Sequence, residues 1–586
     1  MTKFINTLLV VICLACSSIV LALETIEVSI DGVEGPALDN VREFLGIEQQ
    51  KSDPDLNEAR IRRLHRNASE EIRQALEPFG YYAPSIRAEL TQENGIWHAN
   101  YHIDPGTPVR VENIDIRVIG EDEKDEEFQK LVRDFPLRKG DILEHGRYES
   151  GKRAFQALAA ERGYLNAHLP RHEIKVRLER HAADITLHFD TGPRYRFGKI
   201  TFIQPSDPEK SYYDPELLVR YSPFKPGDSY STARLFELQN ALSDSDYFAS
   251  VEVKTRRDQI QDREIPVEVT LEPRSKHRYL AGVGYGTDTG ARGTLGWENR
   301  HVTDSGHRLR ADLRLSEIKS NFTARYRIPT RNPRTDRIEF ISSWLYNNPV
   351  TSKSETLLVG ASHTVFRGSG WLETMYLNYQ MENFTVGDQS GQSNMLLPGI
   401  SWSRVDADSR IYTRHGTRLL LDIKGTDPLL GSNTRFLQIR AQGKLIRPLG
   451  EKGRVILRGD AGVSRVGDFA KLPASLRFFT GGDQTIRGYG YNTLGPIDPK
   501  TGKVVGGEQL VVGSAEYEYS LTEKWSGAVF FDVGNALDDW RQKFKKGTGV
   551  GARWKTPIGL IRVDVAWAIS EPGDPWKFHL VIGPDL

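Results

Sequence analysis

Arg487 and Asp532 are the two residues whose types and surroundings most clearly point to a specific interaction. Arg487 lies in the glycine-rich segment 478–490, FFTGGDQTIRGYG, and Asp532 lies in the apolar segment 528–534, AVFFDVG. An arginine keeps its charge and presents a planar fork of donors that matches a carboxylate, so the two side chains could form a bidentate ion pair. The open alternatives are an ordinary surface arginine in a flexible loop and an aspartate in a general charge network.

The residues around Arg487 favour a loop that folds back into a confined space. Glycine tolerates positive φ and lets two backbones approach closely. The nearby glycines are Gly481, Gly482, Gly488 and Gly490. We expect the loop-fixing motif to consist of Arg487, Gly488, Tyr489 and Asp532. If the ion pair is well buried, removing one partner leaves an unmatched charge at a cost of about 3 to 5 kcal/mol.

The second half of the chain indicates how these residues are positioned. From Arg278 onward, segments of roughly ten residues alternate apolar and polar side chains between turn residues, which is typical of an outer-membrane β-barrel. The segment 308–316, RLRADLRLS, shows this pattern most clearly. Charges at every second position are not tolerated against lipid but are acceptable in a hydrated lumen. Since Phe531 and Val533 then face outward, Asp532 is predicted to point inward.

Counting such segments predicts sixteen strands, an even number as in bacterial single-chain barrels. The expected strands are 278–287, 291–299, 307–316, 321–328, 336–347, 355–366, 370–383, 394–404, 416–424, 433–448, 453–466, 509–519, 525–535, 546–555, 559–568 and 577–583. The one long gap between them, 467–508, contains Arg487. With strands paired in order, this gap is predicted to be the sixth loop on the outer side.

The first and last predicted strands form a seam that we expect to be lightly bonded. Three glycines share one face of the first strand, and glycine weakens a strand because it loses entropy and side-chain packing. The last strand is short against the roughly 9 to 11 residues that a spanning strand needs. The glycines could instead simply make room for the folded loop. The predicted seam residues are Gly282, Gly284, Gly286, Phe578, Leu580 and Ile582.

The first half of the chain contains a weak internal repeat with a step of 83 residues, the distance from Gly80 to Gly163 and from Gly163 to Asp246. Each of these positions follows an amphipathic helix and precedes two alternating segments. Each unit is therefore predicted to be β-α-α-β-β, a small sheet covered by two helices on one face. An open sheet edge can accept an extended peptide, although the units could also serve only as rigid spacers.

The N-terminus indicates secretion. Lys3, the apolar run 8–20 and the small residues before a cleavage point after Ala22 are typical of a signal peptide, with an uncleaved signal anchor as the alternative. Both cysteines, Cys13 and Cys16, lie in this segment, so a processed chain has no disulfide and no cysteine metal site. No run of 18 apolar residues follows residue 23, so a transmembrane helix is not expected.

Composition and motifs argue against other function classes. Lys+Arg and Asp+Glu both number 78, and the resulting net charge of zero provides no basic field for nucleic acid. We find no GxSxG, HExxH or P-loop spacing for a hydrolase or nucleotide enzyme, and the histidines have no metal-ligand spacing. We therefore expect no enzyme activity, no cofactor and no metal.

Together these features resemble the TamA family, the outer-membrane subunit of the translocation and assembly module, in the superfamily that also contains BamA and FhaC. The resemblance covers nearly the whole processed chain and is carried by three β-α-α-β-β units, a barrel, the IRGYG loop motif and the FFDVG strand motif. BamA-like members typically carry five such units, and FhaC-like members carry two and a plug helix, for which this sequence has no room.

The resemblance identifies the repeats as polypeptide-transport-associated (POTRA) domains. The implied fold class is α+β periplasmic repeats followed by an all-β, sixteen-stranded transmembrane barrel. The expected organisation is a signal peptide at 1–22, POTRA 1 at 23–106, POTRA 2 at 107–192, POTRA 3 at 193–276 and the barrel at 277–586, with the inward loop at 467–508. The expected location is the cell outer membrane, with the N-terminal repeats in the periplasm.

The resemblance also implies a function. A member of this family inserts or translocates outer-membrane proteins such as autotransporters by opening its seam laterally. The implied partners are a TamB-like inner-membrane-anchored protein at POTRA 1, the client proteins and outer-membrane lipids. A lipid-transport conduit, a passive or two-partner secretion pore and an outer-membrane hydrolase are the alternatives. A two-partner pore predicts large ion conductance and one dedicated client, whereas an assembly factor predicts several clients and a mostly plugged lumen.

Overall fold

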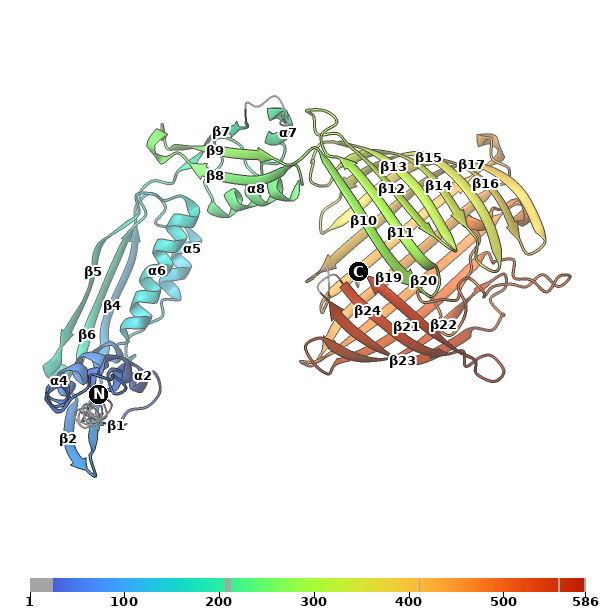
Figure 1. Ribbon diagram of the computed structural model, residues 1–586. Helices are drawn as coiled ribbons and strands as arrows, with labels where there is room; N and C mark the ends of the chain where they lie inside the picture. The colour runs from blue at the N-terminus through green and yellow to red at the C-terminus, as the bar shows by residue number, and fades with distance from the viewer. Residues whose placement is uncertain (1–24, 206–211, 410–411, 557–558, 584–586) are drawn as a thin grey trace, which may run out of the picture. The chain divides into compact units, whose positions relative to one another are not determined.

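The computed structural model describes residues 25–205, 212–409, 412–556 and 559–583. Three three-stranded sheets with helices precede one sixteen-stranded sheet (Figure 1). The predicted fold class, three POTRA-like α+β domains followed by a sixteen-stranded barrel, is confirmed. The predicted signal peptide at 1–22 lies outside the described residues. Within the described ranges, none of the helices is long and apolar enough to cross a membrane.

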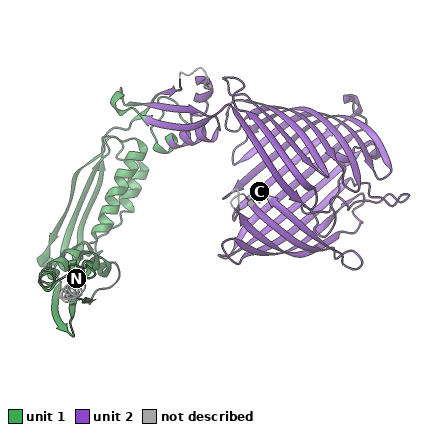
Figure 2. Ribbon diagram, viewed as in Figure 1, with its two compact units in different colours: residues 1–199, 224–235, 255–266 green, residues 200–223, 236–254, 267–586 purple. Residues whose placement is uncertain are grey.

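The chain divides into two compact units, which are described separately (Figure 2). One contains residues 1–199, 224–235 and 255–266, and the other contains residues 200–223, 236–254 and 267–586. The second unit holds the whole barrel and parts of the third repeat.

The first repeat places strands in the order β1-β3-β2, with β1 parallel to β3 and β2 antiparallel to it. Its elements are β1 (Thr25–Asp31), α2 (Gly35–Phe44), α3 (Gly46–Gln49), α4 (Glu58–Leu76), the 3-10 helix η1 (Glu77–Phe79), β2 (Ser85–Glu93) and β3 (Ile96–Asp104). The side chain of Asn57 caps α4 by accepting from the Arg60 amide, as Asn does at helix starts. Ile61, Leu64 and Ile72 of α4 are buried, so the helix packs its apolar stripe into the core of this repeat.

The second repeat has the same topology, with strand order β4-β6-β5. Its elements are β4 (Arg110–Ile119), α5 (Glu126–Arg133), α6 (His145–Arg162), β5 (His168–Arg177), η2 (Leu178–Arg180) and β6 (Ala182–Asp190). Phe128, Phe155 and Phe189 meet in its core. Gly163 ends α6 at φ 85°, a left-handed conformation that glycine adopts without strain, and this explains the glycine at the repeat position.

The third repeat has strand order β7-β9-β8. Its elements are β7 (Arg196–Ile203), α7 (Pro215–Val219), α8 (Thr232–Asp244), β8 (Phe248–Thr255), η3 (Arg257–Gln259) and β9 (Glu264–Pro273). All three repeats therefore follow the β-α-α-β-β order, with the short helix α3 added in the first repeat, and the central strand is last in sequence.

The barrel sheet contains sixteen strands in sequence order, and each is antiparallel to the next (Figure 1). The strands are β10 (His277–Gly286), β11 (Gly290–Asn299), β12 (Arg308–Ser316), β13 (Lys319–Pro329), β14 (Arg337–Asn347), β15 (Ser352–Phe366), β16 (Trp371–Val386), β17 (Gln389–Ala407), β18 (Gly416–Thr426), β19 (Phe436–Leu449), β20 (Gly453–Val466), β21 (Gln509–Ser520), β22 (Trp525–Leu537), β23 (Lys545–Thr556), β24 (Gly559–Trp567) and β25 (Trp576–Gly583). The predicted number of strands is confirmed.

The predicted strand ends are least accurate in one hairpin. β17 begins at Gln389, five residues before the expected 394, and β16 continues to Val386 instead of 383. The added ladder residues are mostly polar, because this hairpin continues past the apolar band. Without lipid on one face, the apolar alternation that marks a spanning strand is lost, while the backbone pairing continues.

The two faces of the barrel wall follow the predicted alternation. On β22, Val529 and Phe531 are 53% and 42% exposed on the outer face, whereas Phe530 between them and Asp532 after them are buried on the inner face. On β20, Leu457 and Val463 are exposed and Ser464 is buried. Inward-facing polar side chains therefore come from every second residue, as the pattern required.

Candidate functional site

Loop 467–508 is a folded element inside the barrel. It contains two short 3-10 helices, η5 (Phe469–Lys471) and η6 (Ala474–Leu476), and its two arms pair through the bridges Phe478↔Gly507 and Thr480↔Leu494. Phe478, Ile486, Tyr489 and Leu494 are buried together with Leu510 and Val512 of β21. On another side, Leu472 and Leu476 pack against Met395 and Leu397 of β17. The loop therefore contacts well-separated parts of the barrel wall.

Arg477 organises the base of this loop. It is only 4% exposed, and its guanidinium donates to the carbonyl oxygens of Leu472 at 2.9 Å and Val505 at 3.1 Å. It also lies 4.6 Å from the ring centre of Phe469. These contacts join the two arms of the loop, because Leu472 and Val505 lie on opposite arms. Arg477 lies outside the predicted loop motif, which begins ten residues later at Arg487.

Arg487 and Asp532 form a bidentate ion pair. Arg487 donates from Nε to Asp532 Oδ2 at 2.8 Å and from NH2 to Asp532 Oδ1 at 2.9 Å, and its backbone amide donates to Oδ2 at 3.0 Å. Arg487 is 3% exposed and Asp532 is fully buried. The structure thus brings together the two residues on which the predicted loop motif depends, with three donors on one carboxylate.

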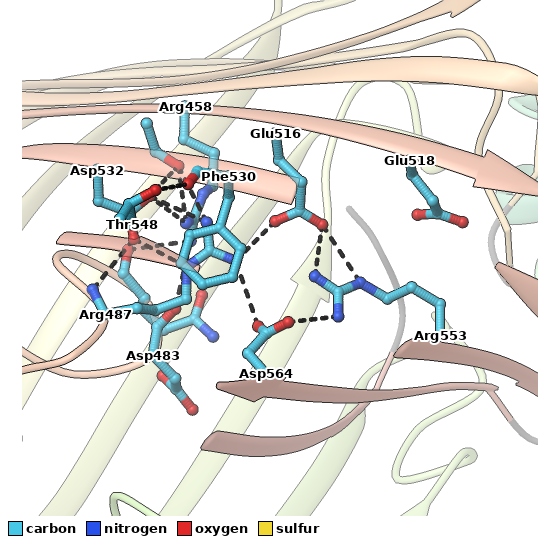
Figure 3. Close-up of polar contacts among 12 residues, drawn as sticks. Arg458, Asp483, Arg487, Glu516, Glu518, Phe530, Asp532, Thr548, Arg553 and Asp564 are labelled. Carbon is cyan, nitrogen blue, oxygen red and sulfur yellow. Dashed lines mark hydrogen bonds and ion pairs between the residues drawn. The ribbon is translucent and has the colours of Figure 1, made fainter. Parts of the chain in front are cut away.

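The pair belongs to a larger charge network (Figure 3). The NH1 group of Arg487 donates to Glu516 Oε2 at 2.7 Å and to Asp564 Oδ2 at 3.2 Å. Arg553 binds the other oxygens of the same two carboxylates, at 2.6 Å for Glu516 and 2.5 Å for Asp564. Each carboxylate therefore bridges two guanidinium groups, which is the condition under which buried charges are stabilised.

Two further side chains complete the surroundings of Arg487. The ring of Phe530 lies over the guanidinium, 3.3 Å from its central carbon to the ring centre, a cation–π contact (Figure 3). Arg458 lies with NH2 3.6 Å from Asp532 Oδ1 and donates to Ser514 at 2.9 Å. Asp532 therefore contacts both arginines, and the charge-network alternative of the sequence analysis coexists with the predicted pair.

Four neighbouring strands position this network. Glu516 comes from β21, Asp532 from β22, Arg553 from β23 and Asp564 from β24, each at an inward position of its strand. Ser514 lies directly opposite Asp532 in the β21–β22 register and donates to it at 2.6 Å. Glu516 and Arg553 were not predicted as partners of the ion pair. The alternation pattern predicts that such residues face the lumen, but it carries no information about their positions along the barrel axis.

Gly488 brings the loop against the last two strands. Its φ is 94°, and a Cβ atom there would lie 2.9 Å from the backbone of Trp567 and Ala568. Its amide donates to His579 Nε2 on β25 at 3.1 Å. The next residue, Tyr489, donates from its hydroxyl to the Lys546 carbonyl oxygen at 3.3 Å. A side chain at 488 would therefore separate the loop from the wall.

The four glycines of the loop serve two different purposes. Gly481 and Gly482 adopt φ 101° and 104°, like Gly488, but Gly490 does not lie in the left-handed region. A Cβ atom at 490 would lie 2.8 Å from Thr493 Cγ2. This glycine is therefore explained by close packing and not by a left-handed turn.

The seam between β10 and β25 differs from every other junction in the barrel. Among the described strands, each consecutive pair shares a backbone ladder, whereas no register joins β10 to β25. Among the described residues, two side-chain hydrogen bonds instead link β25 to β11 and to the turn that follows β10. Arg292 NH2 of β11 donates to the Ile582 carbonyl oxygen at 3.3 Å, and the Leu580 amide donates to Thr287 Oγ1 at 3.3 Å.

The predicted seam residues lie on these two strands. Gly282, Gly284 and Gly286 alternate along β10, and a Cβ atom at 286 would lie 3.9 Å from the Leu580 carbonyl oxygen. Gly282 has open space around it, and Val283 beside it is 97% exposed. On β25, Phe578 is 48% exposed and His579 is buried. The edge of β10 is thus largely uncovered.

The turn between β10 and β11 is tied to the loop. Asp288 Oδ2 accepts from the Asp483 amide at 2.7 Å. Burial, and then the nearby negative charge of Asp483, raise the pKa of Asp288 to about 7. The loop therefore contacts both sides of the seam, at Asp288 next to β10 and at His579 on β25.

Comparisons with known proteins agree with this architecture. The Omp85 superfamily domain matches residues 277–585. The family described as POTRA domain TamA domain 1 matches residues 27–105, and the POTRA family described as surface antigen variable number repeat matches 109–192 and 195–274.

Two similar curated proteins are outer membrane protein assembly factors named BamA. The protein of Nitratidesulfovibrio vulgaris is 22% identical over 378 residues, which is 61% of this chain and 47% of that protein. The protein of Neorickettsia risticii is 21% identical over 492 residues, which is 77% of this chain and 63% of that protein. This chain therefore spans about half to three fifths of their length.

Among solved structures, BamA from Haemophilus ducreyi lacking POTRA domains 1–3 has a similar fold. It matches with a TM-score of 0.66 and 17% identity, over 80% of this chain and 99% of that structure. At this level of identity the match bears on the fold alone.

Proposed function

This chain belongs to the Omp85 superfamily, outer-membrane barrels with N-terminal periplasmic POTRA domains, and from this we propose that it inserts outer-membrane proteins into the membrane through its lateral seam. The observation that carries the proposal is the seam itself. Among the described residues, side-chain bonds at Ile582 and Leu580 link β25 to β11 and to the turn after β10, whereas consecutive strands share backbone ladders. The barrel therefore has one edge that opens at little cost.

The proposed mechanism is an exchange of hydrogen bonds. The amides and carbonyls along the free edge of β10 can pair with an extended client strand, as exposed sheet edges do. β25 has eight residues, fewer than a spanning strand usually has, and a short strand favours a locally thin bilayer. Successive client strands would pair, fold and leave sideways into lipid without covalent chemistry, so the proposed activity is not enzymatic.

The loop is proposed to keep the rest of the wall fixed while the seam opens. Arg487 holds three carboxylates from β21, β22 and β24. Removing one partner of a buried pair costs about 3 to 5 kcal/mol, whereas each hydrogen bond across the seam contributes about 0.5 to 1.5 kcal/mol. Strain from client entry would therefore be relieved at the seam and not within the wall.

A TamA-type role is the more specific part of the proposal. The match of residues 27–105 to TamA domain 1, and the presence of three POTRA repeats, support it. On this reading the clients include autotransporters, a TamB-like inner-membrane-anchored protein docks at POTRA 1, and outer-membrane lipids contact the barrel. The domain limits 23–106, 107–192 and 193–276 belong to the same proposal.

A passive pore or a lipid conduit would use the lumen as its path. Loop 467–508 packs apolar residues against both β17 and β21, which favours a mostly plugged lumen. We therefore favour the assembly factor over the secretion pore and the lipid conduit as the function of this chain.

The test is reconstitution of the purified chain in liposomes. We expect urea-denatured autotransporter barrels to become protease-protected and heat-modifiable faster in these liposomes than in empty ones. We also expect the liposomes that carry the chain to show only a small ion conductance. A chain that conducts ions strongly but accelerates the assembly of none of several clients contradicts the proposal. Liposomes carrying a porin of similar size serve as the control for nonspecific acceleration.

A further inference from the structure

Three cations lie directly opposite one another on the lumen wall. Arg418 of β18 pairs in register with Lys444 of β19, and Lys444 pairs with Arg458 of β20. The neighbouring Leu419 and Leu457 are exposed on the outer face, so the three cations share the inner face. Like charges directly opposite in adjacent strands destabilise a sheet. Such a row calls for a compensating negative charge.

Arg458, at one end of the row, lies 3.6 Å from Asp532, but no described residue compensates the charge at the other end, Arg418. Among the described residues, Arg418 has neither an ion pair nor a hydrogen bond, and it is exposed to the lumen. Asp460, which lies close to the row on β20, is already bound by Arg440 at 2.9 and 2.6 Å and by Gln442 at 2.9 Å. Its charge is therefore matched by Arg440.

A cavity of about 370 Å³ lies over this row. Among the described residues that line it, one is acidic, Asp460, and four are cations, and uncharged hydrogen-bond donors lie among them. The lining includes Arg418, Lys444, Arg458, Gln442, Thr485 and Ser514. The cavity is large enough for a small polyatomic anion, and its walls offer hydrogen-bond donors from several directions.

We propose that the row Arg418, Lys444 and Arg458 binds a phosphate group, independently of the assembly function proposed above. Opposite residues in a ladder lie about 5 Å apart, so the row spans about 10 Å. A single carboxylate is shorter than the row, and its one negative charge does not balance the three positive charges. A phosphate group carries up to two charges and several acceptor oxygens, and guanidinium groups bind such oxygens through paired donors.

The position of the row indicates from which side the ligand enters. Arg418 is the third residue of β18, which runs in the same direction as β10 and so begins on the periplasmic side. A phosphate group reaching the lumen from the periplasm would meet Arg418 first. The same chemistry is offered by a soluble phosphate ester and by a lipid headgroup.

The test is calorimetric titration of the purified full chain in neutral detergent. The probes are inorganic pyrophosphate, short-chain phosphatidic acid and, as a control, short-chain phosphatidylcholine. We expect saturable pyrophosphate binding that Arg418→Gln weakens about tenfold or more and that Arg418→Gln with Lys444→Gln abolishes. Arg314→Gln, which removes another inward arginine on β12, should leave binding unchanged, and Arg418→Lys should retain most of it.

Competition between pyrophosphate and phosphatidic acid would assign the site to a headgroup, and pyrophosphate binding alone would assign it to a soluble phosphate. Absence of saturable pyrophosphate binding overturns the proposal, as does equal weakening by Arg314→Gln. Binding of a tetraglutamate peptide without binding of pyrophosphate would overturn it in favour of an acidic polypeptide. Arg418 is exposed, so Arg418→Gln is expected to fold, and retained heat-modifiability in gels checks this.

Discussion

The side chain of Arg292 on β11 passes over Gly284 of β10 and donates to the carbonyl oxygen of Ile582 on β25. A hydrogen bond thus connects the second strand of the barrel to the last strand, across the first. Gly284 lies directly opposite Arg292 in the β10–β11 register, and a Cβ atom at 284 would lie 2.8 Å from Arg292 Nε. The donor reaches Ile582 at 3.3 Å. The glycine in β10 thus explains how a side chain can connect the two strands where a backbone ladder is missing.

We expect Arg292→Gln to loosen the seam without unfolding the barrel. The bond to Ile582 is one of the two that join β10–β11 to β25, so its loss should raise hydrogen exchange in β25 while total stability falls by only about 1 kcal/mol. Exchange measured by mass spectrometry checks this. Arg314→Gln, on β12, should leave exchange in β25 unchanged. Equal exchange in the Arg292 variant and the parent protein would show that this bond does not hold the seam.

Removing the charge of Asp532 should destabilise the loop strongly. In Asp532→Asn, Arg487 loses its bidentate partner while it stays buried, so the free energy of unfolding should fall by about 3 to 5 kcal/mol. Urea unfolding in detergent micelles measures this. Breaking the exposed pair of Lys471 and Asp468 by Lys471→Gln is the matched control and should change stability by less than about 0.5 kcal/mol. Similar losses for both variants would show that Arg487 is not desolvated.

Gly488→Ala should displace the loop, whereas Gly502→Ala should not. Both glycines have positive φ, 94° and 68°, so both substitutions add backbone strain of order 1 kcal/mol. Only at 488 would the new Cβ atom meet the backbone of β24, at 2.9 Å. We expect limited proteolysis to cut loop 467–508 faster in Gly488→Ala alone. Equal cleavage of the two variants would mean that close approach at 488 does not fix the loop.

Asp288 should make stability depend on pH. Burial and Asp483 raise its pKa from 3.8 to about 7, and Lys577 opposes the shift. The folded protein therefore holds a proton that the unfolded chain has lost between pH 4 and 7. Stability should fall as pH rises through this window, by at most about 1.4 kcal/mol per pH unit.

Asp288→Asn removes this titration while it keeps a side-chain oxygen for the Asp483 amide. Urea unfolding at pH 5, 6, 7 and 8 should give a flatter profile for the variant and a higher stability than the parent protein at pH 8. Parallel profiles for the two proteins would assign the pH dependence to other groups.

Much of the fold was predictable because two periodicities are strong in this sequence. Alternation in segments such as 308–316 gave the strand number and the inward direction of Asp532, and the 83-residue step gave the three repeats. Strand ends such as Gln389 were not predictable, since backbone pairing there continues beyond the apolar band.

The site was only partly predictable, for a different reason. Arg487 and Asp532 stand in distinctive motifs, but Glu516 and Arg553 are two among many inward charges. Which inward charges meet depends on strand register and tilt, and the turns and the closed barrel determine these together. The bond from Arg292 to Ile582 joins residues 290 positions apart, and no local pattern signals it.

The most direct test of the seam mechanism is a reversible disulfide across it. Gly286→Cys and Leu580→Cys place two thiols where β10 and β25 approach, and the native cysteines lie in the predicted signal peptide. Ala311→Cys with Ala324→Cys, directly opposite on β12 and β13, locks strands that are already paired and serves as the control. Autotransporter assembly in proteoliposomes is then measured before and after reduction. The account predicts that oxidation stops assembly only in the seam variant and that reduction restores it. Full activity of the oxidised seam variant would contradict lateral opening.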